Sequence, residues 1–129
     1  MKPLPHQHAL GREGEEVAAA YLVKKGFRLV QRNYRGRHGE IDLIAWDKGV
    51  LVFVEIKTSG STRFGAPETW VTARKQKRIA RTALAYIHQN HLEHTDIRFD
   101  VVAIELRSGH HEVRHIANSF WMPDMEGYF

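Results

Sequence analysis

Glu55 and Lys57 are charged residues at the end of a strongly apolar segment, Val50–Lys57. In an extended strand alternate side chains point to opposite faces, so these two would share one face. Carboxylates and lysines are rarely buried in a sheet unless they are paired or bind a metal. The spacing therefore indicates either a structural ion pair at a sheet edge or a site that uses both charges.

A second carboxylate, that of Asp42, lies in the preceding apolar segment, Glu40–Asp47. If Lys48-Gly49 forms a two-residue turn, with glycine supplying a positive φ, the two segments pair as a hairpin. In that register Asp42 lies directly opposite Glu55. A three-residue turn would place them on opposite faces, so the prediction depends on the turn.

The opposed residues suggest a particular chemistry. Directly opposed Cβ atoms lie about 4.5–5.5 Å apart, and two carboxylates at that distance repel unless a cation or proton intervenes. Mg²⁺ (or Mn²⁺) between Asp42 and Glu55 would resolve the conflict, because these ions prefer hard oxygen ligands. Such a metal can activate water against a phosphodiester, and Lys57 could orient that water or neutralise developing charge. The same register places Glu40 opposite Lys57 as an accessory acid.

Basic residues are distributed unevenly, although the formal net charge is only +4. The interval between Glu68 and Glu93 contains no Asp or Glu, and its basic residues are Arg74, Lys75, Lys77, Arg78 and Arg81. A second cluster comprises Arg28, Arg32, Arg35 and Arg37. Clustered positive charge favours a polyanion, whereas a basic run in isolation is more often a solvated surface. We therefore predict DNA or structured nucleic acid as the partner, contacted by Arg35, Arg37, Arg74, Lys75 and Arg78; the family resemblance described below adds Arg63 as a further expected contact.

Composition excludes several classes of protein. The chain has 129 residues, 43% of them hydrophobic, which fits one domain with a real core. The absence of cysteine excludes disulfides, Cys-based zinc sites and a Cys nucleophile, and is compatible with a reducing cytoplasm. No apolar run reaches the ~18 residues of a membrane span, and the first ten residues lack the apolar region of a secretory signal. We expect a cytoplasmic protein with no membrane contact.

The elements that would position these residues follow the order α-β-β-β-α-β-β, an α/β fold with a mixed sheet flanked by helices. The expected segments are a helix over 10–25, strands over 27–34, 40–47 and 50–57, a helix from Pro67 to Asn90, a strand over 97–106 and a short strand over 113–116. Residues 1–9 are expected to form a flexible arm, 10–122 a single domain and 123–129 a tail.

The chain resembles a known family along most of its length. The resemblance rests on Gly14-Glu15, GEIDLIA at 39–45, LVFVEIK at 51–57, Phe64-Gly65, Lys75, RFDVV at 98–102 and the segment 116–120. These residues are similar to the YraN-like family of small bacterial proteins of unassigned function. That family is related to the PD-(D/E)xK nuclease superfamily, which includes restriction endonucleases and Holliday-junction resolvases.

The resemblance implies a restriction-endonuclease-like, nuclease-like domain and carries the catalytic roles onto Asp42, Glu55 and Lys57. It also implies an accessory acid on the first helix, for which Glu15 is the matching position, and resolvase relatives suggest a homodimer. In one place the chain departs from the pattern. Family members often have a basic residue two positions after the lysine, where this chain has Ser59, with Arg63 the nearest replacement.

Two functions remain open from the sequence. One is a Mg²⁺-dependent endonuclease acting on DNA, with branched or junction DNA as the substrate class that the resemblance suggests. The other is a nucleic-acid-binding module with the nuclease fold and little or no catalytic activity.

Other polar and aromatic residues have mainly structural explanations. The histidines at 88, 91, 94, 110, 111 and 115 are expected at the surface. Trp46 is expected in the core rather than against a base. Arg98 and Asp100 would form a structural pair, or Asp100 would be a further ligand.

Overall fold

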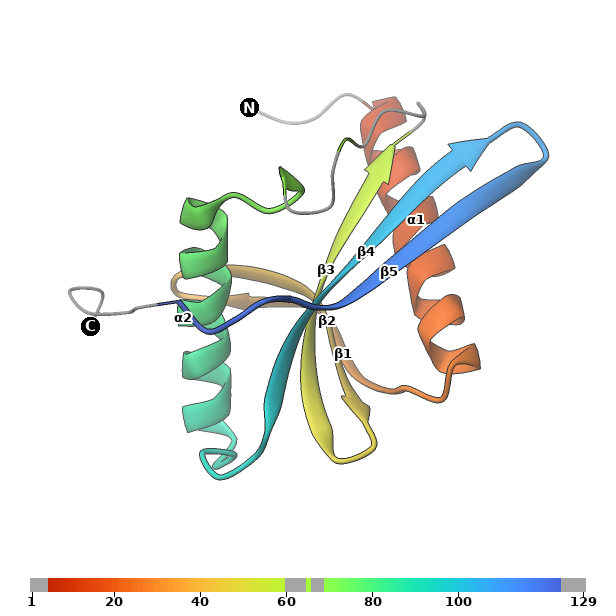
Figure 1. The fold of residues 1–129 in the computed structure, drawn as a ribbon. Helices are drawn as coiled ribbons and strands as arrows, with labels where there is room; N and C mark the ends of the chain where they lie inside the picture. The colour runs from red at the N-terminus through yellow and green to blue at the C-terminus, as the bar shows by residue number, and fades with distance from the viewer. Residues whose placement is uncertain (1–4, 60–64, 66–68, 124–129) are drawn as a thin grey trace.

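The computed structural model describes residues 5–59, 65 and 69–123, and of residues 5–10 only the backbone. Its elements are α1 (Pro5–Lys24), β1 (Arg28–Gly36), β2 (Gly39–Asp47), β3 (Val50–Ser59), α2 (Ala73–Gln89), β4 (Ile97–Arg107) and β5 (His110–Phe120). The strands form one sheet in sequence order, in which only β3 and β4 are parallel. Helices α1 and α2 cover opposite faces of this twisted sheet (Figure 1). The predicted α/β fold, a mixed sheet flanked by helices and consistent with a restriction-endonuclease-like plan, is confirmed.

Strand β3 lies at the centre of the molecule because it is apolar on both faces. Val52 and Val54 pack into a core beneath α1, whereas Leu51 and Phe53 pack into a core beneath α2. These four side chains are at most 1% exposed. A continuous apolar run is what a strand covered on both faces requires. The charged end of β3 is therefore held by two separate cores.

The hairpin between β2 and β3 has the predicted register. Lys48 and Gly49 both have positive φ, 51° and 85°, and Asp47 pairs with Val50. Two positive φ values suit a two-residue turn whose twist matches that of the strands. The prediction of a two-residue turn is therefore confirmed.

Helix α2 begins six residues later than predicted. The sequence placed its first residue at Pro67, which lies outside the described residues, but the helix starts at Ala73. Thr72 is the N-cap, and its Oγ1 accepts a hydrogen bond from the Lys75 N–H at 3.2 Å. A threonine oxygen that satisfies an otherwise unpaired N–H defines a helix start.

Two other boundaries differ from the prediction. Helix α1 begins at Pro5 rather than near residue 10; proline is favoured in the first turn because it needs no hydrogen bond there. Strand β5 covers His110–Phe120 rather than 113–116, because it pairs with β4 along the whole hairpin from Arg107↔His110 to Phe99↔Phe120.

Gly14 brings α1 close to the charged end of β3. Gly14 is buried, and a Cβ at this position would overlap the side chain of Thr58. Only a glycine lets the helix backbone approach the strand so closely. The residue that follows, Glu15, is thereby held near the end of β3.

Candidate metal centre

Asp42 lies where the main-chain ladder between β2 and β3 ends. The last backbone pair of that ladder is Leu43↔Val54. One step beyond, the Ile56 N–H donates to Asp42 Oδ2 at 2.7 Å, so a side chain takes the place of a main-chain acceptor. On the other side of β2, Asn33 of β1 has a positive φ of 51° and interrupts regular pairing near the same level. Local irregularity of this kind redirects side chains at sheet edges and active sites.

Glu55 projects from β3 toward α2. Its side chain is only 12% exposed, and Lys75 Nζ of α2 lies 2.7 Å from Glu55 Oε1. The sequence assigned Lys75 to phosphate contact, and the structure places it at this carboxylate. A buried carboxylate with one cationic partner retains lone pairs for a further ligand.

The electrostatics of Asp42 are unusual. Burial is the main cause that raises its pKa, to about 7 from 3.8, and the charge of Glu55 raises it further. Glu15 of α1 acts in the same direction, while the Ile56 N–H and Lys75 act against it. Carboxylates from three elements therefore crowd one region, and a bound cation would relieve that crowding.

A cleft of ≈ 370 Å³ opens over these carboxylates. It is lined by Gly39, Glu40, Asp42, Glu55, Lys75, Arg78 and Ile79. The volume is large enough for several water molecules or a phosphate group. Asp42 and Glu55, predicted as a pair, thus face the same cavity.

Glu40 and Lys57 are not opposed as the sequence count predicted. The β2–β3 ladder ends before it reaches them, and Glu40 instead pairs with Arg35 of β1, across a 3.2 Å contact to Arg35 Nε. Lys57 lies two residues beyond Glu55 on the same face of β3, half-buried and in register with Ala103 of β4. The expected Glu40–Lys57 opposition is therefore wrong, because β2 leaves β3 after Val54.

The donors present suit Mg²⁺. Asp42 and Glu55 offer hard oxygen atoms, and Mg²⁺ is commonly held by one or two carboxylates together with waters and substrate phosphates. Within the described part of the chain, no three His, Asp or Glu side chains gather into a metal-binding cluster. Glu15 is near enough to affect Asp42 electrostatically without completing such a cluster.

Comparison with known proteins places the chain in a family. A sequence model of the uncharacterised protein family UPF0102 matches residues 14–104. This chain belongs to the UPF0102 family. A UPF0102 protein of Trichlorobacter lovleyi is 46% identical over 114 residues, covering 87% of this chain and 90% of that protein. Another, of Prosthecochloris aestuarii, is 46% identical over 127 residues, covering 94% and 98%. One of Syntrophomonas wolfei is 44% identical over 111 residues, covering 86% and 96%.

The part of this UPF0102 chain that matches the family model includes Glu15, Asp42, Glu55 and Lys57, together with the whole of α2. No helix among the described residues has the length and apolar character needed to cross a membrane. The family model thus spans the carboxylate cleft, the whole of α2 and the part of α1 from Gly14 onward.

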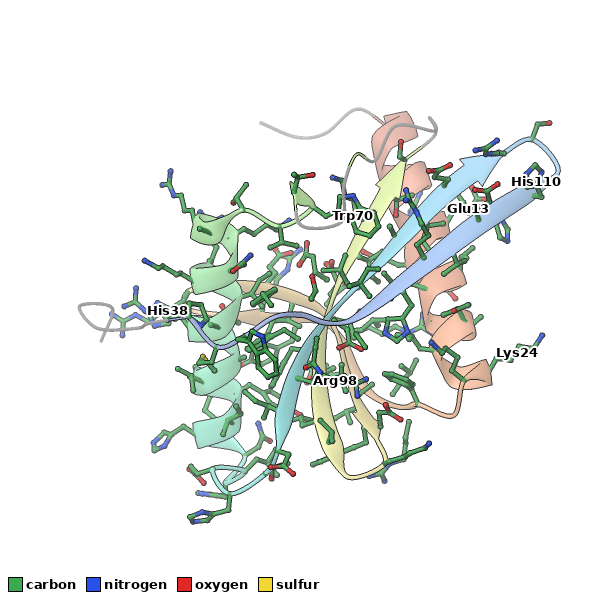
Figure 2. The ribbon with its side chains drawn as sticks, viewed as in Figure 1. Glu13, Lys24, His38, Trp70, Arg98 and His110 are labelled. Atoms are coloured by element: carbon green, nitrogen blue, oxygen red, sulfur yellow. The ribbon has the colours of Figure 1, made fainter. Side chains whose placement is uncertain are left out.

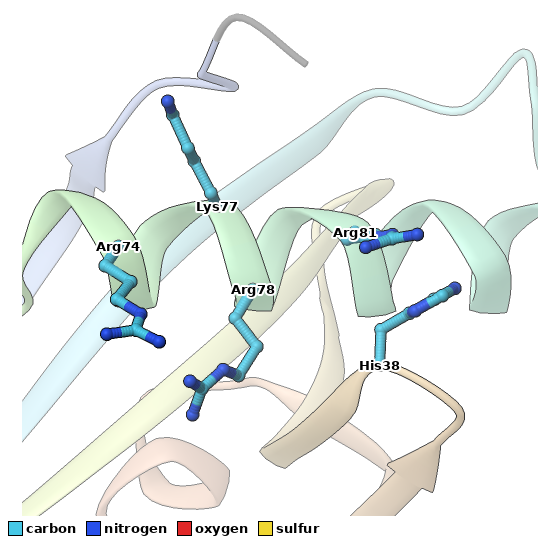
Figure 3. Close-up of a pocket in the computed structure, with 5 residues that line it drawn as sticks. All are labelled: His38, Arg74, Lys77, Arg78 and Arg81. Carbon is cyan, nitrogen blue, oxygen red and sulfur yellow. The ribbon is translucent and has the colours of Figure 1, made fainter. Parts of the chain in front are cut away.

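A second, basic pocket adjoins the carboxylate cleft in this UPF0102 protein. It has a volume of ≈ 200 Å³ and is lined by His38, Arg74, Lys77, Arg78 and Arg81 (Figure 3). Figure 2 shows His38 of the β1–β2 turn beside α2. Of the other predicted phosphate contacts, Arg35 pairs with Glu40, Arg37 is exposed in the β1–β2 turn, and Arg63 lies outside the described residues.

Arg98 and Asp100 form a structural pair on the α1 side of the sheet. Arg98 donates to Asp100 from Nε and Nη2 at 2.8 and 2.9 Å, and also contacts Asp47 at 3.0 Å. His115 Nε2 lies 2.7 Å from Asp100 Oδ2 with its side chain only 4% exposed. The expected surface position of His115 is therefore wrong, because the imidazole supplies a partner that the buried carboxylate needs. Trp46 packs against the core beneath α2, as expected.

The sequence did not predict where two residues, Lys75 and His38, lie in the structure. Lys75 gave no sign of its partnership with Glu55, since that contact depends on how α2 lies across the sheet. The place of His38 beside α2 was equally inaccessible from the sequence. Its only signal was its position beside Arg37 in a turn, and a turn alone does not indicate which helix it meets.

Proposed function

We propose that this UPF0102 protein is a Mg²⁺-dependent (or Mn²⁺-dependent) endonuclease that hydrolyses phosphodiester bonds in DNA, with branched or junction DNA as its expected substrate class. The main support is the placement of Asp42 and Glu55, from two strands, at one cleft bordered by basic side chains. The raised pKa of Asp42 agrees with a site built for a cation.

In this proposal Asp42 and Glu55 hold the metal, and Glu15 adds negative charge from α1. When bound, the ion would polarise a phosphate oxygen and lower the pKa of a coordinated water. The Ile56 N–H fixes one Asp42 oxygen and leaves the other for the ion. Lys57 would orient the attacking water or neutralise charge that develops on the phosphate oxygens.

A nucleic-acid-binding module without cleavage is the second candidate. The observation in its favour is the Lys75–Glu55 ion pair at 2.7 Å, because the lysine already neutralises one proposed ligand. In a binding module this pair would be a permanent structural link. In a nuclease, the Lys75–Glu55 ion pair would open, so that Glu55 could bind the metal and Lys75 could contact a phosphate.

A cleavage screen separates the two functions. Duplex, flap, single-stranded and four-way-junction DNA would be incubated with Mg²⁺ or Mn²⁺, with Asp42→Asn as the matched control. We expect cleavage of at least one substrate by the wild type and none by the variant, which retains an acceptor for the Ile56 N–H. If both proteins bind DNA equally, neither cleaves it and calorimetry detects no binding of a divalent metal, the nuclease proposal is wrong and the binding-module function takes its place.

Lys57→Ala should behave differently from the ligand variants. We expect it to retain metal binding but to lose about 10²–10³-fold in cleavage rate, since it stabilises only the transition state. Asp42→Ala should lose both. Single-turnover cleavage and metal titration, measured on the same preparations, check the distinction; loss of metal binding in Lys57→Ala would contradict the assigned role.

A further inference from the structure

The basic pocket beside the carboxylate cleft is preformed by α2 and the β1–β2 turn. Arg74, Arg78 and Arg81 stand at i, i+4 and i+7, which is one face of a helix. The start of β2 lies close against this face, since a Cβ at Gly39 would come within 3.0 Å of Arg78 Cγ. In Figure 3 the side chains of Arg74 and Arg78 project from the same side of α2, Arg81 lies near His38, and Lys77 points away from them.

Three guanidinium groups of this pocket, those of Arg74, Arg78 and Arg81, are not neutralised by the described residues. Among the described residues, no carboxylate pairs with the guanidinium of Arg74, Arg78 or Arg81, whereas Arg98 is paired with two acids. Partial desolvation, then the charges of Arg81 and Arg37, lower the pKa of His38. A group of cations that repel one another is stabilised by an anion.

We propose that this pocket is a phosphate-binding subsite, which holds a nucleic-acid backbone phosphate next to the one at the Asp42–Glu55 cleft and does so without metal. The position relative to a cleaved phosphate rests on the proposed function, whereas the phosphate binding does not. Arg78 lines both cavities, so the two lie side by side along α2.

The dimensions favour a backbone over a small anion. At about 1.5 Å per residue, the stripe from Arg74 to Arg81 is roughly 10 Å long. A stripe of this length is longer than one phosphate group, so it can contact more than one of the phosphates that recur regularly along a DNA strand. Guanidinium groups also suit phosphate oxygens because they donate two parallel hydrogen bonds.

The first test measures DNA binding in EDTA, so that cleavage plays no part. Arg74→Gln/Arg81→Gln removes two positive charges from the pocket, and Arg78 is kept because it also lines the carboxylate cleft. Lys24→Gln/Arg28→Gln is the matched control, since both residues are exposed and Lys24 lies across the sheet from His38 (Figure 2).

The pocket variant should bind a short duplex more weakly than the control. Its slope of log affinity against log salt should flatten by about 0.9 per lost contact. Arg74→Lys/Arg81→Lys, which keeps the charge, should retain most of the slope, and melting temperatures exclude misfolding. Equal slopes for the pocket variant and the control would overturn the proposal.

The second test uses His38 as a reporter. Its pKa, measured by NMR titration, should rise when the same duplex binds, because a nearby phosphate stabilises the imidazolium against Arg81 and Arg37. In Arg74→Gln/Arg81→Gln the rise should be much smaller. A rise with inorganic phosphate but not with duplex would overturn the assignment to a nucleic-acid backbone. A wild type that passes both tests but cleaves no DNA would refute only the proposed nuclease activity.

Discussion

Asp100 and Asp42 are carboxylates on opposite faces of the sheet, and their surroundings shift their pKa values in opposite directions. Asp100 is fully buried, yet it accepts hydrogen bonds from Arg98, from His115 and from the Asn118 N–H at 3.1 Å. Burial alone would raise the pKa of Asp100, but the hydrogen bonds, led by that from His115, outweigh it and the pKa is lowered.

Around Asp42 the balance runs the other way. Burial and the neighbouring charges of Glu55 and Glu15 raise its pKa, and the Ile56 N–H and Lys75 only partly compensate. Burial alone therefore does not decide the direction in which the pKa of a carboxyl group is shifted. The difference lies in whether the protein supplies enough positive charge and hydrogen-bond donors of its own.

The largest expected effect is at Asp100, the carboxylate whose hydrogen-bonding partners the protein itself supplies. Asp100→Ala should lower the free energy of unfolding by about 3–5 kcal/mol, because it leaves His115 buried without its carboxylate partner and Arg98 with Asp47 alone. Asp42→Ala, the matched change, should cost clearly less, since it also removes repulsion from Glu55. Denaturant unfolding in EDTA measures both, and equal costs would mean that the two carboxylates are alike.

A pH effect of intermediate size should appear only at Asp42. The pKa of Asp42 is raised to about 7 in the folded protein from its ordinary value of 3.8, so the stability that the protonated carboxyl contributes is fully present below pH ~4 and is lost as the pH rises through ~7. Compared with Asp42→Asn, the metal-free wild type should therefore lose stability across this window. Glu55→Gln should narrow the window by lowering the Asp42 pKa, and added Mg²⁺ should offset the loss. Parallel stability–pH curves for wild type and Asp42→Asn would contradict the electrostatic description.

The smallest effect is expected at the exposed edge of the Asp100 cluster. Lys25 Nζ donates to His115 Nδ1 at 2.8 Å, which leaves the Nε2–H of His115 to donate to Asp100. Because Lys25 is exposed, Lys25→Gln should cost only roughly 0–1 kcal/mol. A loss in thermal unfolding as large as that of Asp100→Ala would show that the lysine is essential to the cluster.

The sequence was most informative where a local rule decides the structure. The Lys48-Gly49 turn determined the hairpin register, and the apolar run of β3 determined a strand covered on both faces. Together they brought Asp42 and Glu55 to neighbouring strands. The order of the elements followed from the same periodicities.

Features that depend on competition or on tertiary contact were less accessible. Proline and threonine both favour the start of a helix, so the sequence offers Pro67 and Thr72 as alternatives. In the structure α2 begins at Ala73 with Thr72 as its N-cap. Counting residues outward from the turn does not show that pairing between β2 and β3 stops after Val54. That end point depends on the path of β1 and on the Asp42 side chain. The partnership of His115 with Asp100 joins two strands whose register depends on a bulge.

The close approach of Gly14 to Thr58 makes positions 14 and 58 an epistatic pair. Any side chain at 14 requires space that Thr58 now occupies, so a change such as Gly14→Ala would be tolerated far better in a background that carries Thr58→Ala. The spacing between helix and strand also sets how far Glu15 stands from Asp42. Substitutions at these two uncharged positions would therefore change how strongly Glu15 raises the pKa of Asp42, without altering any acidic residue.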